Sequence, residues 1–234
     1  MNDPIGRAIA DFFEKGKAPD IQIETNYTEG ELLSPAYFFR TENQLPEIET
    51  KALDLCTGKV LDVGAAAGCH ALILQNKELD VTALEKSKLA ASVMKKRGVQ
   101  KVFCTDVFHF HKNGFDTILL LMNGTGIGGT LEGLKNLLIH LKKLLNPGGQ
   151  ILIDSSDISY LFEEEDGSVW VDLTNDGYFG EMEYELTYNN EISRFKWLFV
   201  DYEKLTAIAD SAGLKCSLIV TGNHSDYLAK LITY

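Results

Sequence analysis

Proline and cysteine are scarce in this chain of 234 residues, which contains five prolines and four cysteines. Cys56, Cys69, Cys104 and Cys216 form no Cys-x-x-Cys pair, and no Cys/His spacing is typical of a zinc site. We therefore expect free thiols in a reducing compartment and no bound metal. The longest apolar run, residues 118–122, is too short to cross a bilayer, so no membrane partner is expected.

The N-terminus also lacks the apolar segment of a signal peptide, which predicts a cytoplasmic protein. Basic residues are outnumbered, with 22 Lys and Arg against 34 Asp and Glu and a net charge of −12. A phosphate backbone is repelled by such a charge. The longest basic cluster, residues 95–97, falls at an expected helix end, where cations complement the helix dipole. We expect no nucleic-acid partner, and the sequence does not indicate an oligomeric state.

From residue 59 onward, expected strands alternate with expected helices. The strands cover residues 59–63, 80–85, 101–104, 115–122 and 150–154. Several are apolar on successive residues, as strands buried on both faces are. Alternation with helices implies right-handed crossovers and a parallel sheet. The pattern predicts a doubly wound α/β sheet, and the length suits a single domain over residues 1–234.

Two segments depart from this alternation. Residues 1–45 begin with a helix that Asp3 caps and Gly16 ends, and then read as irregular and aromatic. The insertion at about residues 155–200 contains two strand-like runs around Asn189-Asn190, which predicts a β-hairpin. We expect both segments to cover the ligand crevice, as a cap and a lid.

The end of the chain predicts a strand pair joined by the short connection at residues 222–225. So short a link requires the two strands to be antiparallel. Residues 146–149, NPGG, are expected to form a turn before the strand at 150–154.

A run of small residues follows the first expected strand: Asp62, Val63, Gly64, Ala65, Ala66, Ala67 and Gly68. Small side chains let the backbone approach a ligand, and a helix N-terminus offers N–H groups to an anionic group. The spacing differs from the G-x-G-x-x-G dinucleotide loop, since residue 66 is alanine. A tight turn without a ligand is the alternative interpretation.

Acidic residues end the next two expected strands. Glu85 lies about 20 residues after the glycine turn, where a carboxylate is suited to bind ribose hydroxyls. Asp106 follows the third strand, where it or its backbone could read an adenine amino group. An exposed carboxylate and a turn-forming aspartate are the respective alternatives.

Taken in order, these segments resemble the class I S-adenosylmethionine-dependent methyltransferases. The resemblance lies in VLDVGAAAGCHALILQ, VTALEKS, CTDVF, FDTILLLMNGTG and LLNPGGQILIDSSD, and it covers about residues 50–234. The terminal antiparallel pair resembles the family's ending, in which the reversed last strand lies beside the fifth. The resemblance implies a mostly parallel seven-stranded sheet and methyl transfer from S-adenosylmethionine. Ala66 departs from the glycine often found there, and we expect an altered loop fit.

The resemblance also implies roles for individual residues. Asp62, Gly64 and Gly68 would shape the methionine pocket, Glu85 would bind the ribose, Asp106 would read adenine, and Asn123 would line the pocket floor. Their neighbours complete the predicted cofactor site: Ala65, Ala66, Lys86 and Val107.

No constellation of residues singles out a catalytic base. The candidates are His70, Asp154 and Tyr178, which lie in or after loops expected to face the crevice. The candidates for binding the acceptor or the methionine carboxylate are Tyr27, Tyr37, Arg40 and Trp197. Arg40 could pair with a carboxylate through two of its guanidinium nitrogens, and a surface arginine is the alternative.

The expected acceptor is a small molecule, although the sequence indicates neither its identity nor the atom methylated. Two other functions stay open at this point: a dehydrogenase or other nucleotide enzyme of the same sheet architecture, and a non-catalytic regulator that binds S-adenosylmethionine. The antiparallel ending and the expected NPGG turn argue against a nicotinamide enzyme.

Overall fold

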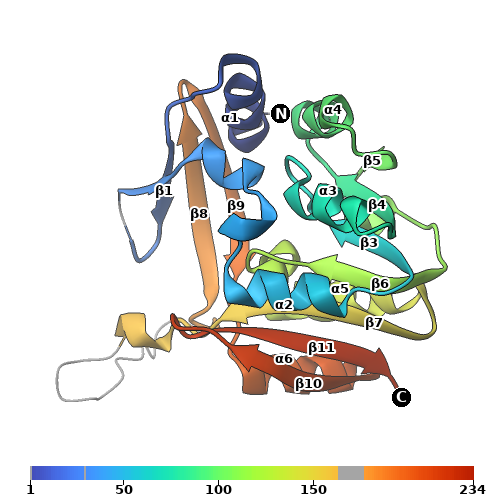
Figure 1. Ribbon diagram of the computed structural model, residues 1–234. Helices are drawn as coiled ribbons and strands as arrows, with labels where there is room; N and C mark the ends of the chain where they lie inside the picture. The colour runs from blue at the N-terminus through green and yellow to red at the C-terminus, as the bar shows by residue number, and fades with distance from the viewer. Residues whose placement is uncertain (1, 29, 163–176) are drawn as a thin grey trace.

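The computed structural model describes residues 2–28, 30–162 and 177–234, so residues 163–176 of the predicted insertion lie outside the described residues. Its larger sheet has seven strands in the order β10-β11-β7-β6-β3-β4-β5 (Figure 1). The strands are β3 (Lys59–Val63), β4 (Asp80–Glu85), β5 (Val102–Cys104), β6 (Phe115–Leu120), β7 (Leu145–Ser156), β10 (Leu214–Thr221) and β11 (Asp226–Thr233).

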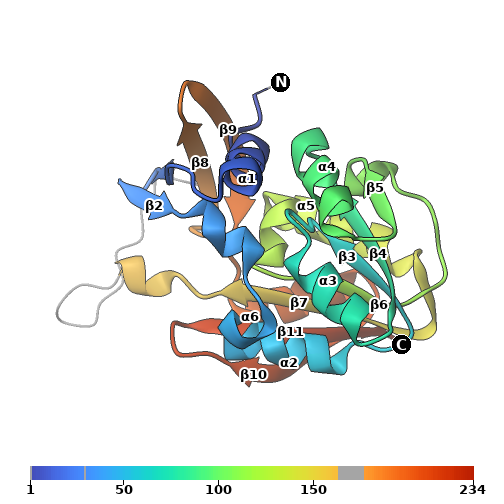
Figure 2. The ribbon, with the colours of Figure 1, turned by 45° about the horizontal axis from the view of Figure 1, so that its top comes forward.

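Strands β3 to β7 pair in parallel, and β11 is inserted antiparallel between β7 and β10. This arrangement confirms the predicted sheet and its reversed last strand. The parallel strands are buried because helices cover both faces, as Figure 2 shows. The helices are α1 (Pro4–Lys15), α2 (Glu47–Leu55), α3 (Cys69–Asn76), α4 (Lys88–Arg97), α5 (Leu131–Lys142) and α6 (Tyr202–Ser211).

The two faces of the sheet carry separate hydrophobic clusters. Leucines of α5 and α6, such as Leu137 and Leu205, pack on one face with Ile118 and Ile151. Residues of α2, α3 and α4, such as Leu53, Leu74 and Met94, pack on the other. The helices are therefore fixed by their apolar stripes, and the loops at the carboxyl ends of the strands stay available for a site.

Residues 146–149, which were expected to form a turn, leave the ladder between β6 and β7, and Gly148 there has a φ of 78°. Residues 146–149 lie within β7, where Phe115 pairs with Leu145 and Thr117 already pairs with Gln150. The segment is a bulge, anchored by a hydrogen bond of 2.7 Å from Asn146 Nδ2 to Asp116 Oδ1. The chain turns from α5 into β7 earlier, at residues 143–144.

Residues 17–45 are also more regular than expected. They contain β1 (Ile21–Thr25) and β2 (Glu31–Leu33), followed by the short 3-10 helices η1 (Pro35–Phe39) and η2 (Glu42–Gln44). The predicted hairpin is present as β8 (Glu181–Tyr188) and β9 (Glu191–Leu198). Strand β1 pairs with β8, so the N-terminal segment and the insertion form one antiparallel sheet in the order β2-β1-β8-β9, which we call the cap sheet.

The cap sheet packs on the large sheet through α1 and α4 (Figure 1). Ile9 of α1, Leu186 and Tyr188 of β8, Val93 of α4 and Ala67 of the glycine-rich loop are buried in one cluster. The expected helix caps are in place, since Asp3 accepts from Gly6 N at the start of α1 and Gly16 ends it in the left-handed conformation. The cap sheet is thus tied to the loop that follows β3.

Candidate functional site

The order of the large sheet reverses between β3 and β6, because the chain proceeds outward from β3 to β5 on one side and from β6 to β7 on the other. In open α/β sheets, ligands bind outside the carboxyl ends of the strands at such a reversal. The segments that follow β3, β4, β6 and β7 meet there, and they contain most of the predicted site residues.

The loop after β3 is tightly wound. Gly64, Ala66 and Gly68 all have positive φ values, of 73°, 48° and 80°. The backbone N–H groups of Gly64 and Ala65 donate to Leu84 O of β4 at 2.9 and 3.1 Å. Ala66 therefore occupies a conformation that favours glycine, which is the local consequence of the departure noted in the sequence.

The surroundings of Gly68 leave no room for a side chain. A Cβ atom there would lie 2.9 Å from side-chain carbons of both Met94 and Val99. The close packing of this turn against α4 and its C-terminal extension therefore excludes a side chain. Ligand approach is not needed to explain this residue.

Glu85 at the end of β4 holds this loop. Its Oε2 atom accepts from Ala66 N at 2.9 Å and its Oε1 atom from Ser87 N at 2.8 Å. Burial raises the pKa of the carboxyl, and these two N–H groups oppose the shift. Ser87 Oγ donates in turn to Asp3 Oδ2 at 2.6 Å, which connects Glu85 to the start of α1. The neighbouring Lys86 is exposed, with Nζ 6.0 Å from the Phe195 ring centroid.

Asp106 is exposed and caps the 3-10 helix η3 (Val107–His109) by accepting from Phe108 N at 2.9 Å. The side chain therefore forms a turn, as the alternative interpretation expected, and Val107 beside it is buried. Reading of adenine by this segment stays a prediction. His109, the last residue of this 3-10 helix, and His111 just after it are both exposed.

The turn after β6 is strained. Met122 and Asn123 have φ values of 68° and 58°, a conformation that non-glycine residues seldom adopt. The buried carboxylate of Asp154 supports the turn by accepting from Met122 N at 3.1 Å and from Gly124 N at 2.9 Å. Burial raises the pKa of Asp154 to about 6, against the effect of these N–H groups. Asn123 Oδ1 accepts from Ser156 Oγ at 2.9 Å.

A buried chain of charged groups lies beside this turn. Glu49 of α2 accepts from both terminal nitrogens of Arg40 at 2.9 Å each, and its Oε2 atom lies 2.5 Å from His70 Nε2. All three residues are buried: the exposed fraction is 8% for Arg40, 4% for Glu49 and 6% for His70. The Arg40 guanidinium also stacks 3.6 Å above the Tyr37 ring. The alternative of a surface arginine was therefore wrong, and the predicted carboxylate role of Arg40 stays a prediction.

His70 opens α3 directly after the glycine-rich loop. Burial lowers the pKa of this histidine, but hydrogen bonds to Cys69 and Glu49 and the nearby Asp62 charge raise it well above the usual range. Asp62 itself is buried, and its Oδ2 atom has no hydrogen-bond partner among the described residues. Desolvation raises the pKa of Asp62 accordingly.

A cavity of about 180 Å³ lies at the carboxyl ends of β6 and β7. Ten residues line it: Tyr37, Pro46, Ile48, Glu49, Met122, Asn123, Asp154, Ser156, His224 and Asp226. Sequence reasoning placed Tyr37, Asn123 and Asp154 near the crevice but missed Glu49 and Asp226. Those two lie on α2 and on the last hairpin, and no local pattern connects them.

Arg40 and His70 contact Glu49 in the cavity wall, whereas Tyr27, Tyr178 and Trp197 do not line the cavity. The Tyr178 hydroxyl donates to Asp201 Oδ2 at 2.7 Å, at the start of α6, and burial raises its pKa. Trp197 of β9 packs against Gly126, where an added Cβ would lie 1.9 Å from the indole. Tyr27 is exposed and packs edge-on against Phe162.

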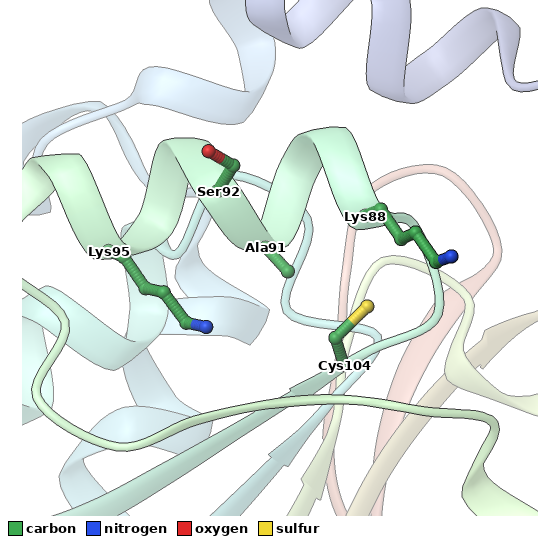
Figure 3. Close-up of a pocket in the computed structure, with 5 residues that line it drawn as sticks. All are labelled: Lys88, Ala91, Ser92, Lys95 and Cys104. Atoms are coloured by element: carbon green, nitrogen blue, oxygen red, sulfur yellow. The ribbon is translucent and has the colours of Figure 1, made fainter.

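A second hollow, of about 380 Å³, lies between α4 and the edge strand β5. Figure 3 shows Cys104 beneath Ala91, with Lys88 and Lys95 on either side. None of the predicted site residues lines it. In the described part of the chain, no group of three or more His, Cys, Asp or Glu residues could hold a metal ion, and no helix is long and apolar enough to cross a membrane.

No protein-family model and no curated protein matches this chain. Among solved structures, it is similar to an S-adenosylmethionine-dependent methyltransferase from Bacteroides fragilis in complex with S-adenosylhomocysteine. The identity is 41%, the TM-score is 0.93, and the match covers 99% of this chain and 95% of that one.

Two more distant structures show the fold alone. The CcbJ methyltransferase from Streptomyces caelestis is 12% identical with a TM-score of 0.66, and 98% of each chain is covered. The sugar N-methyltransferase KedS8 from Streptoalloteichus is 16% identical with a TM-score of 0.58, over 84% of this chain and 87% of that one. The near-complete match at 41% identity decides the family and confirms the predicted enzyme class and methyl donor. The chain belongs to the class I S-adenosylmethionine-dependent methyltransferases.

Proposed function

We propose that this enzyme methylates a small molecule bound in the cavity at the carboxyl ends of β6 and β7, which we call the acceptor cavity. The observation that carries the proposal is the position of this cavity, between the strained turn after β6, the end of β7, and Tyr37 and Ile48 from the N-terminal part of the chain. S-adenosylmethionine supplies a methyl group already activated by its sulfonium charge. The protein's own task is to align the acceptor with that methyl group and to exclude water.

The residues around the glycine-rich loop fit this methyl donor. Each Glu85 oxygen accepts one backbone N–H, which leaves lone pairs for ribose hydroxyls. The unpaired Oδ2 atom of buried Asp62 is an acceptor that lacks a donor, and an unsatisfied buried oxygen is costly unless a ligand or water supplies one. The roles predicted for Asp106 and Asn123 are part of this proposal.

Size and charge both favour a small acceptor. Pockets for drug-sized ligands measure roughly 300–1,000 Å³, and the acceptor cavity, at about 180 Å³, suits a smaller molecule or the reacting end of one. The net charge of −12 disfavours nucleic acid. KedS8, which has the same fold, is named as a methyltransferase of a sugar, and a sugar is an acceptor of this small size.

Two measurements test the proposal. Titration calorimetry should detect binding of S-adenosylmethionine and S-adenosylhomocysteine but not of NAD. A screen that follows S-adenosylhomocysteine formation should then find turnover with small molecules and none with RNA or a basic peptide. Absence of binding of either sulfur compound, or turnover confined to the polymers, would refute it.

A further inference from the structure

The tip of the β10–β11 hairpin brings two titratable side chains, His224 and Asp226, to the acceptor cavity. Asp226 opens β11 opposite Ser156 at the end of β7. Ser225 has a φ of 57°, and its carbonyl accepts from Asp157 N at 2.8 Å, which anchors the tip to the segment after β7. Backbone pairing therefore sets the position of Asp226, and the adjoining turn that carries His224 is held through its N–H hydrogen bond to Asp226 Oδ1.

The polar groups that line the cavity differ in how far they are already satisfied. Glu49 is paired with Arg40 and His70, and Asp154 accepts from Met122 N and Gly124 N. Asp226, by contrast, accepts at Oδ1 from His224 N at 3.0 Å.

Within the described chain, the Asp226 Oδ2 atom and the His224 ring have no hydrogen-bond partner. Among the described residues that line the cavity, none is a lysine or an arginine. The hairpin tip thus offers a free acceptor and a titratable ring to a ligand.

We propose that the methyl acceptor is an amine, which Asp226 binds as the ammonium and His224 deprotonates. This inference rests on the proposed function and specifies its substrate class. The carboxylate supplies the charge and the hydrogen-bond acceptor that an ammonium group needs. The imidazole supplies a ring nitrogen that can act as a general base. The charged and titratable groups facing His224 across the cavity are Asp226, Asp154, Glu49 and Tyr37.

The proton and electron balance of the step is simple. A neutral ring nitrogen of His224 takes one proton from the ammonium, which leaves a neutral amine with a free lone pair. That lone pair forms the new N–C bond, and the methyl–sulfur bond breaks with its electron pair on sulfur. The methylated amine leaves as an ammonium, and the imidazolium returns its proton to solvent.

Other acceptor atoms suit this cavity less well. A neutral hydroxyl is too weak an acid for imidazole to deprotonate extensively, and it gains little from the Asp226 charge. A thiol reacts as the thiolate, an anion that the carboxylates of Asp226 and Asp154 would repel. An ammonium is attracted by the same carboxylates, so the charge of the cavity selects among these classes.

The experiment uses the full chain with S-adenosylmethionine and a panel of matched small amines, alcohols and thiols, followed by S-adenosylhomocysteine formation and product mass. We expect turnover of amines only.

Asp226→Asn should raise the KM of the best amine at least about tenfold. His224→Ala should lower kcat by about 10²–10⁴-fold, with partial recovery on addition of imidazole. Asp20→Asn and His111→Ala, both at exposed positions, are the matched controls and should change neither constant.

A binding measurement on the wild-type enzyme covers the case in which a variant fails to fold. With S-adenosylhomocysteine bound, ammonium compounds should raise the Tm more than their alcohol isosteres. Methylation of thiols or alcohols instead of amines, no turnover of any amine, or full activity of folded His224→Ala would overturn the amine proposal while cofactor binding persists. Loss of cofactor binding by the wild-type enzyme would contradict the proposed function itself, and the amine proposal with it.

Discussion

At the scale of single residues, Glu85 is the residue that we propose to bind the ribose of the methyl donor. It accepts backbone N–H groups from two loops and has lone pairs left for a ribose. Glu85→Ala should weaken S-adenosylhomocysteine binding by at least about tenfold, since hydrogen bonds to charged groups contribute roughly 1.5–3 kcal/mol. Calorimetry of folded Glu85→Ala checks this, with exposed Glu78→Ala as the control. Unchanged affinity would exclude the ribose role.

Glu49 should be the most sensitive charged residue for stability. Its replacement by Leu leaves buried Arg40 and His70 without their shared partner, and breaking a buried ion pair costs about 3–5 kcal/mol. Denaturant unfolding of Glu49→Leu measures the loss. Glu47→Leu, an exposed position on the same helix, should cost far less. Equal losses at the two positions would show that the ion pairs add nothing specific.

Asp154 predicts a pH dependence of stability. Its folded pKa of about 6 lies above the ordinary 3.8, so the folded state binds the proton more tightly than the unfolded state does. Stability from this group is complete below pH 3.8 and is lost as the pH rises to about 6, by roughly 3 kcal/mol. The unfolding free energy of wild type should therefore fall relative to Asp154→Asn across this window. A constant difference would contradict the raised pKa.

At the scale of elements, the contact between β9 and the 3-10 helix η4 (Gly124–Gly128) joins the cap sheet to the large sheet. A Cβ at residue 126 would lie 1.9 Å from the Trp197 indole. Gly126→Ala should therefore cost about 1–3 kcal/mol through overpacking. In a Trp197→Ala background the same change should cost much less. Additive losses in the double-mutant cycle would show that the two residues act separately.

At the scale of the whole molecule, the N-terminal segment supplies parts of two different structures. Residues 1–40 contain α1, β1, β2 and η1, and they also contain Arg40 and Tyr37. Their deletion removes two strands of the cap sheet, Tyr37 from the lining of the acceptor cavity, and Arg40, one of the two partners of Glu49. We expect loss of methyl transfer to exceed the loss of S-adenosylhomocysteine affinity, provided that circular dichroism shows a folded sheet. Full turnover by the truncated chain would contradict this expectation.

The sequence by itself determined the strands and helices from residue 59 onward and their parallel sheet, because those depend on local periodicity, caps and turn residues, and the family resemblance supplied the reversed last strand. Asp3 and Gly16 both act where the sequence placed them. The candidate cofactor residues lie at or just after the carboxyl ends of the expected strands, which face one crevice, and their roles stay predictions.

Tertiary structure alone decided the cap sheet and the acceptor cavity. Strands β1 and β8 pair across more than 150 residues of sequence, and no local pattern encodes such a pairing. Glu49 meets Arg40 and His70 only because α2, η1 and α3 converge. The sequence alone therefore indicates an exposed glutamate on a helix surface. His224 and Asp226 reach the cavity because β11 is inserted beside β7. Local chemistry fixed the elements, and long-range packing decided which side chains share a site.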